Sequence, residues 1–183
     1  MDNIIILLVG KSGSGKTTVA DMLTKKYNLS VLKSYTTRSP RINDDSHIFV
    51  SIDEFNKLEN KIAYTEFNGN YYCATAEQLD NNDIYVIDPD GIEYLKEHYH
   101  GSKRLIDIYI DCDEKTRRSR MKQRGDTSEQ IESRISNDEI KFDMQKYKPT
   151  TIISNNEGRD LDTLVDTIYH YACAIDTLSV ITH

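Results

Sequence analysis

A glycine-rich segment near the start of the chain carries the clearest chemical signal. Residues 10–17 read Gly-Lys-Ser-Gly-Ser-Gly-Lys-Thr, which satisfies the phosphate-loop pattern Gly-x-x-x-x-Gly-Lys-Ser/Thr. Glycines let the backbone curl so that successive N–H groups face phosphate oxygens, and a following helix N-terminus adds partial positive charge. In such a loop Lys16 reaches the β- and γ-phosphates, and the Thr17 hydroxyl can ligate Mg²⁺. The segment predicts a nucleoside triphosphate site, and its context disfavours a chance match to a glycine- and serine-rich turn.

Two further groups of basic residues could bind phosphate. Residues 34–41 read Ser-Tyr-Thr-Thr-Arg-Ser-Pro-Arg and place Arg38 and Arg41 three residues apart. Arginine forks grip phosphate in a bidentate manner, so this pair suits an acceptor monophosphate. Taken alone, the segment could equally be two surface arginines beside a proline turn. Six more basic residues lie between 115 and 124, where any single one fits a solvated helix face.

Composition narrows the class of protein that could carry these groups. The 183 residues predict one domain, and the net charge of −7 argues against nucleic acid as a main partner. The longest apolar run, residues 4–9, is too short to span a membrane, and it lacks the basic flank and cleavage site of a signal peptide. Cys73, Cys112 and Cys173 are odd in number and widely spaced, so we expect reduced thiols. These features predict a cytoplasmic protein with no membrane partner.

Strand-like and helix-like stretches alternate along most of the chain and would position these residues. The run at 4–9 is typical of a fully buried strand, and a helix from about 16 to 27 follows the loop. Further strands are predicted at 84–87, 105–110 and 151–153, and further helices at about 91–99, 113–124, 128–145 and 161–175. The alternation predicts an α/β fold with a mostly parallel sheet and helices on both faces. The segment at about 34–80 mixes short strands and helices and is predicted to be an insert.

Several short motifs follow the phosphate-binding loop in a specific order. They are Ser-x-Thr-Thr-Arg-x-Pro-Arg at 34–41, Phe-Val-Ser with Asp-Glu-Phe at 49–55, Phe-Asn-Gly-Asn-Tyr-Tyr at 67–72, Ile-Asp-Pro-Asp at 87–90, Arg-Met-Lys-Gln-Arg-Gly at 120–125, and Ile-Glu-Ser-Arg at 131–134. In this order the chain resembles guanylate kinase from about residue 4 to 170. The resemblance implies a P-loop NTPase kinase core, a small acceptor-binding insert and a helical lid.

The resemblance also implies roles for individual residues. On the ATP side the family pattern assigns phosphate and Mg²⁺ contacts to Lys16 and Thr17, and the adenine-side loop to Asn155. The remaining ATP-binding candidates belong to the loop and the helix after it: Gly10, Ser12, Gly13, Ser14, Gly15 and Thr18. The acceptor side would comprise Arg38, Arg41 and Tyr72 around the phosphate, Ser34 at the base, and Asp88 and Asp90 near the metal and the base. Arg120, Arg124 and Arg134 would close from the lid and, with Lys16 and Arg38, form the catalytic set.

The chain departs from the family pattern where the family reads guanine. Ala63 stands where the family has a glutamate, Ala74 where it has a serine or threonine, and His47 where it has a tyrosine that contacts the acceptor phosphate. Losing the carboxylate should weaken the preference for guanine or redirect it to another base. Alternatively, the alignment shifts and Glu66 or Asp90 reads the base.

We therefore predict ATP-dependent phosphoryl transfer to a nucleoside monophosphate, with Mg²⁺, by a single domain that is a monomer or a homodimer. The core would comprise about 1–33, 81–112 and 146–183, the acceptor-binding insert about 34–80, and the lid about 113–145. GMP or dGMP is the first candidate acceptor, and another or modified nucleoside monophosphate is the second. A non-catalytic module that binds protein segments is the alternative from another class, and the intact loop lysine and lid arginines weigh against it. A kinase of another small metabolite is disfavoured by the motif at 34–41.

Overall fold

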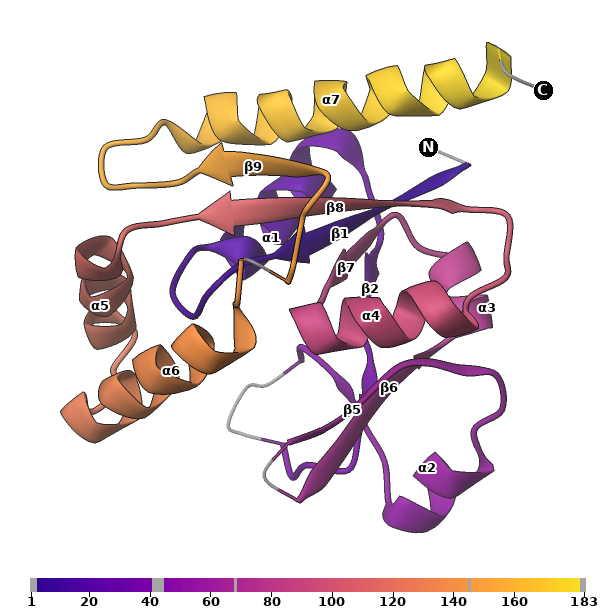
Figure 1. Ribbon diagram of the computed structural model, residues 1–183, viewed down its shortest axis with the longest axis horizontal. Helices are drawn as coiled ribbons and strands as arrows, with labels where there is room; N and C mark the ends of the chain where they lie inside the picture. Colours follow the sequence, from indigo (N-terminus) through magenta and orange to yellow (C-terminus); the bar gives the residue numbers. More distant parts are fainter. Residues whose placement is uncertain (1–2, 41–44, 68, 145, 182–183) are drawn as a thin grey trace.

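The computed structural model describes residues 3–40, 45–67, 69–144 and 146–181, and it is built around a five-stranded parallel sheet (Figure 1). The strands lie in the order β2 (Val31–Leu32), β7 (Ile84–Val86), β1 (Ile4–Val9), β8 (Arg104–Asp111) and β9 (Thr151–Ser154). All four neighbouring pairs are parallel. The predicted α/β fold with a parallel sheet flanked by helices is confirmed.

The central strand β1 is buried on both faces, as its unbroken apolar sequence predicts. Ile4, Ile6 and Leu8 pack with apolar side chains of α1 (Lys16–Tyr27) and α7 (Leu161–Ile181). The alternate residues Ile5 and Leu7 pack on the other face, with side chains of α4 (Pro89–His98) and of the second sheet. Within the described ranges, none of the helices has both the length and the apolar character that a membrane crossing requires.

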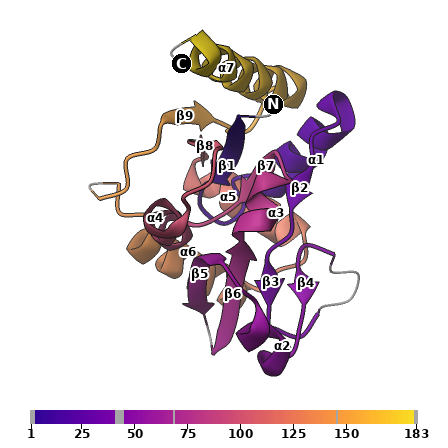
Figure 2. The same ribbon diagram turned by 90° about the vertical axis from the view of Figure 1, so that its right-hand side faces the viewer.

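A second, mixed sheet lies beyond α4, in the lower part of Figure 1 and again in Figure 2. Its strands lie in the order β4 (Ile48–Phe49), β3 (Tyr35–Thr36), β6 (Asn70–Thr75) and β5 (Lys61–Phe67). The short helices α2 (Ile52–Lys57) and α3 (Ala76–Asp80) both begin with a capping box. The pairing of β5 with β6 shifts between Ile62 and Thr65, where Ala63 has a φ of +53°. This bulge bends β5 locally relative to the rest of the sheet.

Two helices, α5 (Glu114–Gln123) and α6 (Ser128–Lys141), lie at the end of the parallel sheet where the phosphate-binding loop is (Figure 1). They are joined by a short connection in which Gly125 has a φ of +96°. Met121 of α5 and Ile131 and Ile135 of α6 form a small apolar cluster of their own. The pair of helices therefore has some internal packing that is separate from the two clusters of the main core.

The predicted helix limits differ from the structure most at α7, which continues past the predicted end at 175 to Ile181, and next at α6. We expected a helix over 128–145, but α6 ends at Lys141, and residue 145 lies outside the described residues. Phe142 leaves the helical conformation, and its ring packs into the core edge to face against Tyr109 of β8. At α4 the prediction began two residues late, because Asp88 caps the helix and Pro89 occupies its first position.

Candidate active site

The phosphate-binding loop connects β1 to α1 and wraps around its own lysine. Gly15 has a φ of +97° at the N-cap of α1, a left-handed conformation that suits glycine. The Lys16 Nζ atom donates hydrogen bonds to the carbonyl oxygens of Gly10, at 2.5 Å, and Lys11, at 3.2 Å. Burial lowers the pKa of the Lys16 ammonium to about 8, although the Asp138 carboxylate opposes that effect. Thr17 and Thr18 follow on the first turn of α1 and are exposed.

The back of the loop is supported by two side chains from other elements. Asn155, only 1% exposed, donates its side-chain N–H to the Ser14 carbonyl at 2.8 Å. Arg120 of α5 donates to the same carbonyl at 3.3 Å. A Cβ atom at Gly15 would lie 2.5 Å from the Asn155 amide nitrogen, so a larger residue would displace this support. The structure thus places Asn155 behind the loop, where it orients the loop backbone.

A buried carboxylate of α6 binds the front of the loop. Asp138 accepts hydrogen bonds from the Ser12 backbone N–H at 2.7 Å and from the Ser12 hydroxyl at 3.1 Å. The Arg117 guanidinium of α5, also buried, lies 3.2 Å from the same carboxylate. This contact joins both helices to the loop through one ion pair. Asp138 was not among the predicted site residues, and Arg117 was predicted only as one of six basic residues between 115 and 124.

We expect the Asp138→Ala variant to lose about 3 kcal/mol of unfolding free energy, because Arg117 would remain buried without its counter-charge. Urea denaturation followed by circular dichroism measures this loss. The control is the double variant Asp138→Leu with Arg117→Met, which removes both charges and should recover most of the stability. If the double variant is as unstable as the single one, the ion pair is not the reason that the carboxylate matters.

The acceptor-side candidates lie on β3 and β6 and in the segments beside them. The Ser34 hydroxyl is buried and lies 3.0 Å from His47 Nδ1, and the His47 ring meets the Tyr72 ring edge to face at 5.7 Å between centroids. The Arg38 guanidinium lies over the Phe49 ring, 5.3 Å from its centroid. Arg41 lies outside the described residues. Ser34, His47 and Tyr72 thus form one connected polar group.

The residues expected near the base occupy different environments. Ala63 and Ala74 are both buried in the same core cluster, but only Ala63 is among the described residues that line a cavity, as a base-pocket residue should; Ala74 pairs with Ile62 across the sheet. Asp88 lies two residues after β7, caps α4 by accepting from the Gly91 N–H at 2.8 Å, and lies 3.0 Å from Lys141 of α6. Asp90 is more exposed, with a carboxylate oxygen 3.5 Å from Lys141 Nζ.

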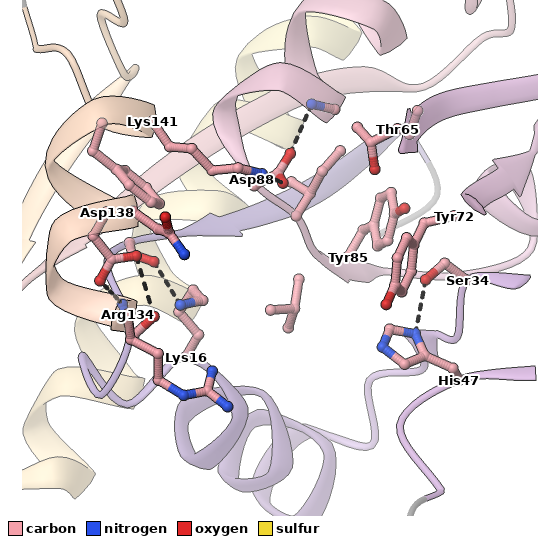
Figure 3. A pocket seen from close by; sticks show the side chains of 18 residues that line it. Lys16, Ser34, His47, Thr65, Tyr72, Tyr85, Asp88, Arg134, Asp138 and Lys141 are labelled. Carbon is pink, nitrogen blue, oxygen red and sulfur yellow. Dashed lines mark hydrogen bonds and ion pairs between the residues drawn. The ribbon is translucent and has the colours of Figure 1, made fainter. Parts of the chain in front are cut away.

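A cavity of about 430 Å³ connects these groups (Figure 3). Its walls come from the phosphate-binding loop, from the second sheet, from the end of β7 and from α6. Among the predicted residues, those that line it are Gly10, Ser12, Lys16, Ser34, Tyr72, Asp88 and Arg134. Lys16 of the loop, the hydroxyls of Ser34 and Tyr72, and Arg134 of the predicted lid therefore line the same cavity.

The three arginines of the predicted lid have different partners. Arg120 contacts the loop, as described above. Arg124 Nη2 lies 2.5 Å from the Asp126 carboxylate, and Arg134 Nε lies 3.3 Å from the same group. Asp126 thus holds two of the arginines near the turn between the helices.

Sequence reasoning missed three residues of α6 that line the cavity with Arg134. They are Asn137, Asp138 and Lys141. They lie three, four and seven residues after Arg134, which places all four on one helix face. That spacing was visible in the sequence, but nothing local indicated that this face meets the loop and β7.

One family description and several guanylate kinases match this chain. Residues 6–142 match the family described as AAA domain. The guanylate kinase of Bacteroides fragilis is 31% identical over 175 residues, with 87% of this chain and 83% of that protein covered. The guanylate kinase of Anaplasma phagocytophilum is 32% identical over 152 residues, with 72% and 70% covered.

Solved structures show the same likeness in three dimensions. The crystal structure of guanylate kinase from Anaplasma phagocytophilum superposes with a TM-score of 0.58 at 25% identity, covering 94% of this chain and 87% of that one. An uncharacterized protein from Eubacterium ventriosum reaches a TM-score of 0.52 at 19% identity, covering 92% and 98%, and supports the fold alone.

Proposed function

We propose that this chain, which belongs to the guanylate kinase family, transfers the γ-phosphoryl group of ATP to GMP or dGMP and releases ADP and the diphosphate. The family membership makes the chain a nucleoside monophosphate kinase; the choice of guanine is the proposal, and it follows the guanylate kinases to which the chain is similar. One observation carries the transfer between two bound nucleotides. A single cavity extends from Lys16 in the phosphate-binding loop to Ser34 and Tyr72 on the acceptor side.

The proposed reaction depends mainly on how the protein positions the two substrates and neutralises their charge. Phosphoryl transfer needs the donor and acceptor in line and the charge on the transferring group neutralised, with little covalent work for the protein. We assign the ATP phosphates to the loop N–H groups and Lys16, the acceptor phosphate to Arg38, Arg41 and Tyr72, and the base end to Ser34 and Asp88. Asn155 supports the loop from behind through its bond to the Ser14 carbonyl.

The donor set fits an Mg²⁺ ion that arrives with ATP. In the described part of the chain, no three His, Cys, Asp or Glu side chains gather as a dedicated metal site. Mg²⁺ in kinases is held largely by substrate phosphates, waters and one or two protein oxygens. Thr17, exposed directly after Lys16, would supply a hydroxyl ligand. The bound ion would neutralise charge on the phosphate oxygens.

We propose that α5 and α6 act as a lid and that the second sheet acts as the acceptor-binding insert. When both nucleotides bind, Arg124 and Arg134 would exchange the Asp126 carboxylate for phosphate oxygens. This exchange would close the lid and exclude water from the transferring group. The insert and the lid both line the cavity, so the substrates themselves would join them.

A panel of acceptors tests the proposed activity. The protein is incubated with ATP and Mg²⁺ and with each ribo- and deoxynucleoside monophosphate, including modified bases, and ADP is measured. The proposal predicts the highest kcat/KM for GMP or dGMP. A modified or different base with a clearly higher kcat/KM would replace guanine as the acceptor while leaving the kinase activity in place.

We expect the Ala63→Glu variant to shift preference toward guanine over adenine by about 1–3 kcal/mol, the scale of hydrogen bonds to a charged group. Ala63 lines the cavity, so a carboxylate there could accept from the two N–H groups on one guanine edge. The kcat/KM values for GMP and AMP in both proteins measure the shift.

Ala63→Gln is the matched control, because it has the same size and backbone demand without the charge. Ala63 already adopts a φ of +53°, so neither substitution introduces a new backbone strain. A wild-type protein that is strongly selective for guanine, with both variants unchanged, would show that Ala63 does not face the base.

A further inference from the structure

The cavity has a third polar corner that the two phosphates do not account for. Figure 3 shows three groups around the central space: Lys16 with Arg134, Ser34 with His47 and Tyr72, and Lys141 with Asp88. The first group suits the transferring phosphate, and Tyr72 of the second group suits the acceptor phosphate, while Ser34 lies at the base end. The base of the acceptor must lie away from both phosphates, which directs it toward the Lys141–Asp88 corner.

The two side chains of this corner are fixed by the elements that carry them. Lys141 is the last residue of α6, and its Nζ atom lies 3.0 Å from Asp88 Oδ2 and 3.5 Å from Asp90 Oδ2. Asp88 is held in turn by capping α4 through its other oxygen. The side chains of Lys141 and Asp88 are 27% and 33% exposed, so both retain a surface that faces the cavity.

Both members of the pair can take part in several hydrogen bonds at once. An ammonium group carries three donors, and an ionised carboxylate offers about four acceptor positions. Burial acts to lower the pKa of Lys141, but the Asp88 and Asp90 carboxylates outweigh burial and raise it, so the donor stays charged. A donor beside an acceptor complements a carbonyl beside a ring N–H, which is the edge that 6-oxopurines present.

We propose that Lys141 is a specificity-determining residue that reads the acceptor base together with Asp88. The ammonium donates to the 6-oxo oxygen and the carboxylate accepts from the adjacent N1–H. Adenine presents an amino group and an unprotonated nitrogen on this edge, which opposes both partners. The inference rests on the proposed function and extends it, because the pair does not require the 2-amino group, so IMP should serve within about tenfold of GMP.

The other candidate groups around the cavity are already engaged or misplaced. Asp138, the second carboxylate among the described lining residues, is occupied by Ser12 and Arg117. Ala63 offers only a methyl group, and Glu66 is exposed. The corner of Lys141 and Asp88 is therefore the place where a charged donor and a charged acceptor meet the base.

IMP and AMP form the sharpest test, because they differ only at the edge that the pair would read. We would measure kcat/KM for phosphorylation and equilibrium dissociation constants by calorimetry, for wild type, Lys141→Met and Lys141→Arg. The wild type should prefer IMP. Lys141→Met should reduce the IMP-to-AMP ratio at least about tenfold, the effect of removing a hydrogen bond to a charged group, and Lys141→Arg should largely retain it.

Lys122→Met, an exposed lysine of α5, is the matched control and should leave the ratio unchanged. Equal losses for IMP and AMP in Lys141→Met would reduce Lys141 to a structural role, and an unchanged ratio would place base reading elsewhere; either result overturns the inference. If the dissociation constants shift as expected but no phosphorylation occurs, base reading by Lys141 stands and the proposed kinase reaction fails. Phosphorylation with an unchanged ratio removes this inference alone.

Discussion

Replacing Lys16 with alanine is expected to lower kcat about a thousandfold, the scale of removing one preorganised group that stabilises developing charge. The Lys16 ammonium lies within the loop that would cradle the phosphates and is held by the carbonyls of Gly10 and Lys11. The free energy of unfolding should change little, because losing the hydrogen bonds to the two loop carbonyls is offset by relief of the ammonium's desolvation. Steady-state kinetics with ATP and GMP, beside a denaturation curve, measure both effects.

Lys25→Ala removes the same charge from an exposed part of α1 and is the matched control. A pH series adds a second readout, because the Lys16 pKa is about 8 in the nucleotide-free protein. As pH rises through that value the amine becomes neutral, so ATP affinity should fall between pH 7 and 9.5 and binding should take up a proton. The Lys16→Ala variant should lack this dependence. Near-normal turnover in the variant would contradict the proposed phosphoryl transfer.

Replacing Arg134 with alanine should lower kcat about a hundredfold while KM for either nucleotide changes less than about threefold. In the structure Arg134 lines the cavity, but its guanidinium is held by Asp126 at 3.3 Å. If it moves to the phosphates only when the lid closes, its contribution belongs to the transition state and not to substrate binding. Initial rates over a grid of ATP and GMP concentrations separate the two parameters.

Arg118→Ala is the matched control, because Arg118 is a lid arginine that pairs with Glu114 and Glu132. The Arg118→Ala variant should keep kcat within about twofold of the wild-type value, since such exposed ion pairs contribute little to stability. A rise in KM alone for Arg134→Ala would make Arg134 an ordinary substrate clamp. No effect on either parameter would remove it from the site.

The features that could be predicted from sequence are those specified by neighbouring residues. The unbroken apolar run of β1 requires burial on both faces, and the glycine spacing after it permits only a curled loop before a helix. Fold class and the phosphate-binding loop therefore followed directly. The helix cap at Asp88 and Pro89 was equally local, and a closer reading would have placed the start of α4.

The features that could not be predicted depend on which surfaces meet. The sequence could not show that Ala63, which shares a core cluster with Ala74, also lines the cavity, because this depends on the bulge in β5. The α6 helix ends before Phe142, whose ring packs in a core cluster, and no local sequence pattern predicts that contact. A one-residue shift in a strand reverses its faces, so such assignments need the assembled sheet.

The sequence alone thus determined the fold class, the triphosphate loop and the arginines that could meet phosphate, because each rests on residues adjacent in the chain. Only the tertiary structure decided which charges meet. It joins Asp138 to Ser12 over 126 positions and Lys141 to Asp88 over 53. Coulombic and hydrogen-bonding energies depend on distance in space and on burial, and the spacing of residues along the chain predicts neither. The base-reading corner is therefore a property of the packing of α6 against the end of β7.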